Sequence, residues 1–231
     1  MIGLPGQTLA DAEATVQALL GLPVDHISFY SLSLEEGTPL QKQCAANPDL
    51  LPDELTEREQ YHRIRQMLRQ AGFEHYEISN AARPGHRCRH NLVYWSGNPY
   101  YGFGAAAHSY LQGVRRSNPA GLDAYIGMFG KDDRSAGPSG RPGEGLYPAG
   151  RVEETVDGEG ARKEMLMLGL RLLEGVRSQD FYDRFGCDLQ SCFAGQISQL
   201  VRRGLLQADA DGIRLTLAGL DLANQVFCEF V

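Results

Sequence analysis

Between residues 129 and 160 the sequence changes character, and this break determines how the rest of the chain can be divided. Eight of the 27 glycines fall in this stretch, together with Pro138, Pro142 and Pro148, while large apolar side chains are few. Glycine and proline at this density disfavour both helices and strands. We therefore expect a flexible Gly/Pro-rich linker over 129–160 that separates a larger region, 1–128, from a smaller one, 161–231.

The larger region alternates between strand and helix patterns, as βα units do. Residues 1–4 predict the end of a strand, and Thr8, with Asp11 three residues on, predicts the start of a helix. Further strands are expected over 26–34 and 73–78, separated by a loop rich in proline and a helix over 54–71. The apolar face expected for that helix consists of Leu55, Tyr61, Ile64 and Leu68. This order predicts an α/β fold.

The smaller region combines helices with one hairpin. Helix patterns cover 163–173, 178–185 and 193–203, a hairpin turns at Asp209-Ala210-Asp211-Gly212, and Thr216 opens a last helix. This order is typical of a small winged-helix-like α+β domain. Winged helices often read DNA, but the third helix carries only Arg202 and Arg203 at its end, so a protein-interaction or structural role is favoured.

Composition narrows the classes of function. The net charge of −7 argues against a general nucleic-acid binder, because phosphate contacts need local positive charge. No apolar run approaches the roughly 18 residues of a membrane-spanning helix, so we expect no transmembrane segment. The cysteines show no disulfide framework, which fits a reducing cytoplasm.

Candidate chemistry concentrates between residues 90 and 110. His90-Asn91-Leu92-Val93-Tyr94-Trp95 contains the only tryptophan, and a run of small residues at 104–107 leads to His108. Imidazole is a common axial ligand of haem iron, Tyr94 and Trp95 offer flat apolar surface for a porphyrin, and Asn91 can orient the imidazole. The alternatives are an ordinary surface or helix-cap histidine for His90 and a hydrogen-bonded core histidine for His108.

Four motifs, in a fixed order, carry a resemblance to a known family. They are I-G-L-P-G-Q-T at 2–8, S-L-E-E-G-T-P-L at 33–40, H-Y-E-I-S-N at 75–80, and C-R-H leading into H-N-x-x-Y-W at 88–95. In this order they resemble the HemW-type haem chaperones, a radical S-adenosylmethionine (SAM) group similar to the oxygen-independent coproporphyrinogen III oxidases. The resemblance implies the second half of a radical-SAM (β/α) partial barrel followed by a winged-helix-like domain.

The resemblance also implies two cofactors that this chain is poorly equipped to bind. The family uses a C-x-x-x-C-x-x-C loop to hold a 4Fe–4S cluster that anchors SAM, and the loop is absent here. The five cysteines are widely spaced: Cys44, Cys88, Cys187, Cys192 and Cys228. We therefore expect a C-terminal part of a family member that neither binds the cluster nor cleaves SAM, which leaves its status as an enzyme uncertain.

The resemblance assigns residues to two sites. At the first strand end, Met1 would pack on the adenine of SAM, and Gly3, Gln7 and Ser33 would lie close to the same ligand. Without the resemblance, the pattern indicates only glycines that a turn requires and polar residues at strand ends. In the second site His90 would ligate haem iron, and the small-residue turn would bring His108 to the barrel mouth as a second contact to haem or SAM.

Two main functions follow from the resemblance. The first is a haem-binding chaperone that delivers haem to respiratory cytochromes or other acceptors, and the alternative is a radical-SAM oxidoreductase of the coproporphyrinogen III oxidase type. A winged-helix interaction module is a third candidate. The H-N-x-x-Y-W element favours the haem chaperone. A cytoplasmic location is expected, and attachment to the inner membrane face and homodimer formation are left open.

Overall fold

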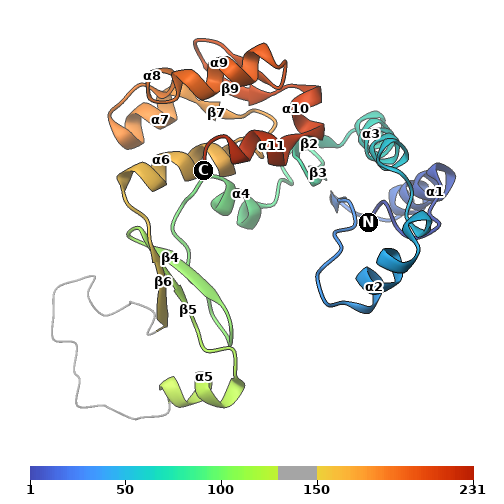
Figure 1. Cartoon of the computed structure of the whole chain (residues 1–231), viewed down its shortest axis with the longest axis horizontal. Helices are drawn as coiled ribbons and strands as arrows, with labels where there is room; N and C mark the ends of the chain where they lie inside the picture. Colours follow the sequence, from blue (N-terminus) through green and yellow to red (C-terminus); the bar gives the residue numbers. More distant parts are fainter. Residues whose placement is uncertain (130–149) are drawn as a thin grey trace.

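The computed structural model describes residues 1–129 and 150–231. Figure 1 shows α1 and α3 on one side, the C-terminal helices on the other, and the sheet β4–β6 with α5 reaching away from both. The expected linker, 129–160, lies largely outside the described residues. Its last part is ordered, because Arg151–Thr155 form strand β6 and α6 begins at Gly158.

The first helices begin where the capping residues predict. Helix α1, Leu9–Leu20, starts at a complete capping box: the Thr8 hydroxyl accepts from the Asp11 amide, and the Asp11 carboxylate accepts from the Thr8 amide. Helix α3, Glu54–Gln70, is capped by Asp53 and buries Tyr61, Ile64 and Leu68. Leu55 is 81% exposed, so its assignment to the apolar face was wrong.

Strand pairing in the larger region is mostly antiparallel. The strands β1, β2 and β3 form a sheet in the order β1-β3-β2; their bounds are His26–Ser28, Glu74–Glu77 and Asn80–Ala82. The expected strand over 26–34 is therefore shorter. Among the described residues, parallel pairing is limited to a bridge between Ile2 and Ser31, in which the Ile2 amide donates to the Tyr30 carbonyl and the Leu32 amide donates to the Ile2 carbonyl.

Further helices and strands lie along the chain between β1 and α6. Thr38 caps α2, Pro39–Ala46, which precedes a single 3-10 turn at Pro48–Leu50. Helix α4, Arg89–Trp95, coincides with the H-N-x-x-Y-W element. Strands β4 and β5 form a hairpin that β6 extends into a sheet, and α5 follows β5; the remaining bounds are His108–Leu111, Val114–Ser117 and Leu122–Phe129.

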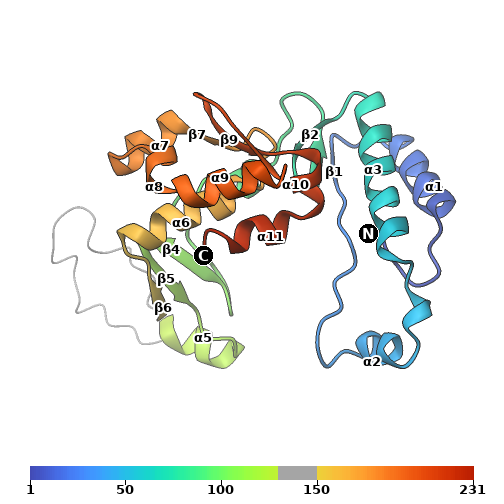
Figure 2. The same cartoon turned by 45° about the horizontal axis from the view of Figure 1, so that its top comes forward.

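The C-terminal region has the predicted winged-helix-like order (Figure 2). Helix α7 has the predicted bounds, Ser178–Phe185, whereas α6, Gly158–Gly169, begins and ends earlier than expected. A sheet in the order β7-β9-β8 forms the wing, and the last helix is broken at Leu222 into α10 and α11. The other bounds are Val176–Arg177, Leu206–Ala208 and Gly212–Leu215 for the strands, and Leu189–Cys192, Ala194–Arg202, Leu217–Asp221 and Ala223–Cys228 for α8 to α11.

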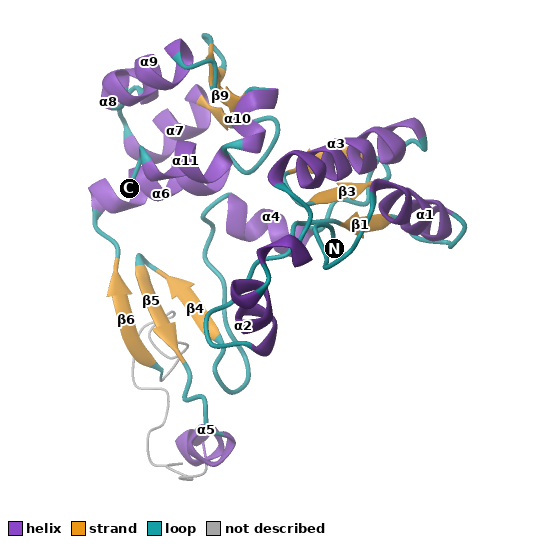
Figure 3. Ribbon diagram, turned by 45° about the vertical axis from the view of Figure 1, so that its right-hand side comes forward, coloured by secondary structure: helices purple, strands orange, loops and turns teal. Residues whose placement is uncertain are grey.

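The two regions are joined by backbone hydrogen bonds and a common core. The Ile78 amide donates to Arg171, and the Leu173 amide donates to Tyr76, so the end of β2 pairs with the chain that follows α6. One buried apolar cluster includes residues of α1 and α3 as well as residues of α6, α7 and α11. Figure 3 shows α4 between these two groups of helices.

Among the described residues, the helices all lack the length and apolar content needed to cross a bilayer.

Candidate functional site

His90 lies in the first turn of α4 and is exposed. Residues four apart share a helix face, so Tyr94 lies beside it: the ring centroids are 4.9 Å apart, and the Tyr94 hydroxyl is 3.4 Å from Nε2 of His90. This distance is long for a hydrogen bond that involves a hydroxyl group. The His90 imidazole is therefore accessible and only weakly held.

The aromatic surface beside His90 continues into the loop after α4. Tyr100 packs edge-on against Tyr94 with centroids 4.5 Å apart, and Tyr110 follows at 6.3 Å from Tyr100. Tyr100 and Tyr110 are fixed by two backbone hydrogen bonds of 2.9 Å each. Sequence reasoning missed Tyr100, although the aromatic-rich stretch 100–103 directly follows the H-N-x-x-Y-W element.

Trp95 points away from this surface. Five residues after His90, it lies on another helix face, and the Arg171 guanidinium lies over its ring at 4.3 Å. Its indole Nε1 is buried without a hydrogen-bond partner in the described chain. Trp95 also lines a groove of about 270 Å³ with Met165 and Leu172 of the C-terminal region. The structure therefore joins His90 with Tyr94 but not with Trp95.

Asn91 contacts Tyr76 rather than His90. A hydrogen bond from Asn91 is one influence on the Tyr76 hydroxyl, whose pKa is raised, with burial as the main cause. The same hydroxyl lies 2.9 Å from Nε2 of His26 and accepts from the Cys88 amide at 3.2 Å. Asn91 thus helps to fix the start of α4 on the sheet, and the expected orienting bond to His90 is not formed.

His108 lies apart from His90, at the start of β4. It is exposed and pairs with Ser117, the last residue of β5 before the chain turns toward α5. It lines an open cavity of about 700 Å³ together with Asn118, Pro119 and Met128. The core-histidine alternative was wrong, because the side chain is exposed.

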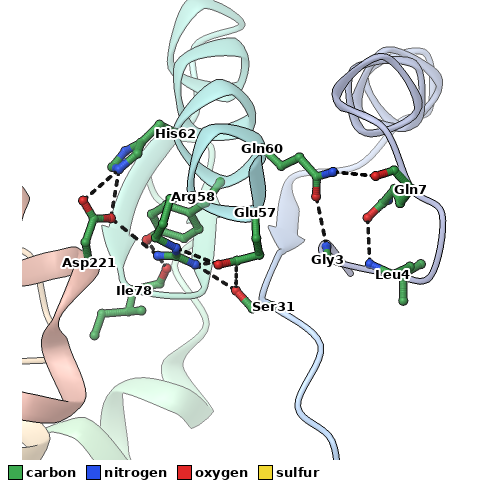
Figure 4. A network of polar contacts seen from close by, with 11 residues as sticks. Gly3, Leu4, Gln7, Ser31, Glu57, Arg58, Gln60, His62, Ile78 and Asp221 are labelled. Atoms are coloured by element: carbon green, nitrogen blue, oxygen red, sulfur yellow. Dashed lines mark hydrogen bonds and ion pairs between the residues drawn. The ribbon is translucent and has the colours of Figure 1, made fainter. Parts of the chain in front are cut away.

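The residues expected to meet SAM at the first strand end hydrogen-bond within the protein (Figure 4). Gly3 has φ +69, and its amide donates to the Gln60 side chain at 3.0 Å. The Gln7 side chain accepts from the Leu4 amide at 3.2 Å and donates to the Met1 carbonyl at 3.4 Å. The Gln7 amide therefore stabilises its own turn, and Met1 is exposed.

A charged network lies next to this turn, between α3 and α10 (Figure 4). Glu57 accepts from Ser31 and from Arg58, and Arg58 also lies 3.5 Å from Asp221, which His62 contacts at 2.9 Å. Burial acts to raise the pKa of Glu57, but the hydrogen bonds from Arg58 and Ser31 outweigh it and lower the pKa. Ser33 lies in an exposed loop beyond this network.

A cavity of about 400 Å³ adjoins the same network. Its lining includes Arg58, Asp221 and Arg171, with apolar surface from Ile78 and Phe227. Most of its charged groups are already paired with one another, which leaves little free charge to select a ligand.

The described residues do not fit a 4Fe–4S cluster. Cys44 is buried on α2, Cys88 precedes α4, and the others lie in the C-terminal region. In the described part of the chain, no three histidine, cysteine, aspartate or glutamate side chains are grouped so that they could hold a metal ion. An accessible imidazole beside edge-on aromatic rings, by contrast, offers a nitrogen donor and apolar ring surface, the two kinds of group that contact haem.

Comparison with known proteins places the chain in a family. Residues 156–222 match the HemN C-terminal domain. The chain is 32% identical over 229 residues to heme chaperone HemW of Lactococcus lactis, covering 99% of this chain and 56% of that protein. It is 33% identical over 231 residues to heme chaperone HemW of Bacillus subtilis, covering 100% of this chain and 57% of that protein. The chain belongs to the HemW/HemN-like radical SAM family.

A solved structure supports the fold of this family member. Coproporphyrinogen III oxidase (HemN) from Escherichia coli superposes with a TM-score of 0.68 at 16% sequence identity, covering 99% of this chain and 53% of that one. The expected fold, part of a radical-SAM barrel with a winged-helix-like domain, is confirmed. The chain spans about half the length of these relatives.

Proposed function

We propose that this chain carries the haem-binding surface of a haem chaperone, with His90 as the axial ligand of the iron. The proposal rests on one observation above all: an exposed imidazole at the start of an ordered helix, next to the Tyr94 and Tyr100 rings. It is supported by the similarity to proteins named heme chaperone HemW.

In this proposal haem is cargo. Imidazole Nε2 supplies the bond to iron, and the rings of Tyr94 and Tyr100 supply apolar contact to one side of the porphyrin. The Tyr94 hydroxyl must leave Nε2 before iron can bind, and the 3.4 Å separation makes that cost small. An exposed site also favours transfer, because an acceptor protein can reach the haem without opening the fold of the chaperone.

Trp95 and His108 have different roles in this proposal. Trp95 packs α4 against Arg171 and so holds the helix in place, rather than covering the porphyrin. His108 lines a separate cavity and serves as an alternative ligand to be tested. The haem acceptors we propose are respiratory cytochromes or other haem proteins. The chaperone would bind them in the cytoplasm or at the inner membrane face.

The test is haem titration of His90→Ala, followed by the Soret band. We expect binding to weaken about tenfold or more, which corresponds to about 1.4 kcal/mol or more of binding free energy. His86→Ala is the matched control, because His86 is exposed, lies four residues before His90, and has its ring 3.6 Å from Asp25 rather than beside an aromatic ring of α4. It should leave both the affinity and the spectrum unchanged.

Two variants of Tyr94 separate the roles of its ring and its hydroxyl. Tyr94→Phe keeps the ring and frees Nε2, so haem binding should be equal or tighter. Tyr94→Leu removes the ring and should weaken binding, since an aromatic contact contributes about 0.5–1.5 kcal/mol. Unaltered spectra and affinity in His90→Ala would contradict the ligand assignment, and the same titration of His108→Ala would then test His108.

A further inference from the structure

Two cysteines, Cys187 half-buried and Cys192 exposed, lie together at the junction of α7 and α8. Helix α7 ends at Phe185, and Gly186 takes the left-handed conformation, φ 67, that turns the chain sharply. Cys187 follows, then Asp188 caps α8 by accepting from the Ser191 amide at 2.7 Å, and Cys192 is the last residue of α8. This turn places the Cys192 and Cys187 sulfur atoms 3.1 Å apart.

The surroundings of the pair favour one thiolate. Nη1 of Arg162, in α6, lies 3.7 Å from the sulfur of Cys187. The hydrogen bond from Cys192 and then the Arg162 guanidinium lower the pKa of Cys187, while the same hydrogen bond raises the pKa of Cys192. The lowered pKa favours the thiolate form of Cys187, and the raised pKa favours the protonated form of Cys192.

The other cysteines do not share this arrangement. Cys44 is buried, and Cys228 is exposed at the end of α11, far along the chain from any other cysteine. The pair also lacks further ligands, since within the described ranges, 1–129 and 150–231, no group of three metal-binding side chains is formed. Two close thiols without other ligands favour disulfide chemistry over a metal centre.

We propose that Cys187 and Cys192 form a reversible redox pair that reacts with small-molecule disulfides. The Cys187 thiolate attacks one sulfur of the disulfide R–S–S–R, forms a mixed disulfide and releases one thiolate, RS⁻. The Cys192 thiol then loses its proton and attacks the Cys187 sulfur, which expels the second RS⁻. The pair loses two electrons to the small molecule, which leaves as two thiols after taking up two protons.

Little movement is needed for the second step. A disulfide has a sulfur–sulfur bond of about 2.05 Å, so the two sulfur atoms must approach by about 1 Å. The turn between α7 and α8 is short, and neither cysteine is buried. Reduction by excess thiol reverses the reaction. The oxidised form ties the end of α7 to the end of α8.

The test uses the whole chain in buffers of oxidised and reduced glutathione, with alkylation, intact mass measurement and peptide mapping. The wild type should form an internal Cys187–Cys192 disulfide and retain no glutathione at these positions. Cys192→Ser should stop at one glutathione on Cys187. Arg162→Gln should slow the first step, by about threefold or more at neutral pH, because it lowers the thiolate fraction of Cys187.

Cys228 supplies an internal control, because it is exposed but has no neighbouring thiol. Iodoacetamide should label Cys187 faster than Cys228 at pH 7 in the reduced protein. Equal labelling rates, or glutathione retained separately on both Cys187 and Cys192 in the wild type, would overturn the proposal. Faster glutathione addition to Cys192 in Cys187→Ser than to Cys187 in Cys192→Ser would overturn the assignment of the attacking thiol.

Discussion

His75 is a partly buried histidine whose two ring nitrogens both have partners. Nδ1 accepts from Nε of Arg65 at 3.1 Å, so Nε2 carries the proton and donates to the Ile78 carbonyl at 3.2 Å. The rings of Phe29 and Tyr61 lie against it. Burial, more than any other influence, lowers the pKa of His75 from 6.5 to about 4. A neutral imidazole is therefore part of the folded structure.

This pKa predicts acid sensitivity with a definite sign. Between pH 6.5 and about 4 the unfolded chain holds a proton on His75 that the folded chain lacks, so the free energy of unfolding falls as the pH falls through this window. His75→Gln, which can keep both hydrogen bonds, should flatten this dependence in urea unfolding at several pH values. His86→Gln, at an exposed position, should not.

Glu77 acts in the opposite direction. Burial raises its pKa, and because its folded form then binds the extra proton, its contribution to stability falls as the pH rises above 4.5. Glu77 is present in the wild type and in His75→Gln alike, so the difference between the two proteins isolates His75. Parallel pH curves for the two proteins would refute the assignment.

Residue roles were predictable from the sequence only where they depend on spacing along one helix. The four-residue spacing of His90 and Tyr94 puts them on one face of α4, whereas Trp95 falls on another face. Asn91 contacts Tyr76 and His62 contacts Asp221, which are distant in sequence, whereas Gln7 forms hydrogen bonds within its own turn. A sequence motif contains no information about these contacts. The motif therefore brought His90 and Tyr94 together by their spacing but did not give the contacts of Asn91 and Trp95.

At the scale of helices and strands, most local start signals were interpreted correctly, whereas strand pairing was not. The capping box at Thr8 and the N-cap at Thr216 lie within four residues of what they stabilise, so the sequence was sufficient. Helix α2 was missed although Thr38 and Pro39 are good start signals. Strand β3 was also missed; it pairs with β2, just before it in sequence, and with β1, whose residues lie more than 50 positions away.

Gly219 tests how closely the elements of the C-terminal region pack. This residue of α10 is buried, and a Cβ there would overlap the carbonyl of Leu205. We expect Gly219→Ala to lower the free energy of unfolding by about 1–3 kcal/mol, the usual cost of overpacking. Thermal denaturation followed by circular dichroism would measure it.

Gly195, in the first turn of α9, is the matched control. A Cβ at Gly195 meets no atom within 4 Å. Alanine favours helix more than glycine does, so Gly195→Ala should raise stability by up to about 1 kcal/mol. Equal effects of the two substitutions would show that the contact between α10 and the chain before β8 is looser than described.

At the scale of the whole molecule, the division at 129–160 that the sequence suggests does not separate two cores. The pairing of 76–78 with 171–173 and the contact of Arg171 with Trp95 join the regions on both sides of that stretch. Arg58 and His62 of α3 add ion pairs to Asp221 of α10. Composition can suggest where a chain divides, but it carries no information about which surfaces pack together.

We therefore expect 1–129 and 150–231 to unfold in one cooperative transition. Trp95, the only tryptophan, lies at the junction, so its fluorescence and the far-ultraviolet circular dichroism should give coincident melting curves. Leu68→Ala in α3 and Leu166→Ala in α6 form a matched pair, since both leucines are 0% exposed. Each substitution should lower the free energy of unfolding by about 2–5 kcal/mol and shift both melting curves to lower temperature by the same amount. If Leu166→Ala lowered only the circular dichroism transition and left the Trp95 transition in place, the two regions would be independent folding units.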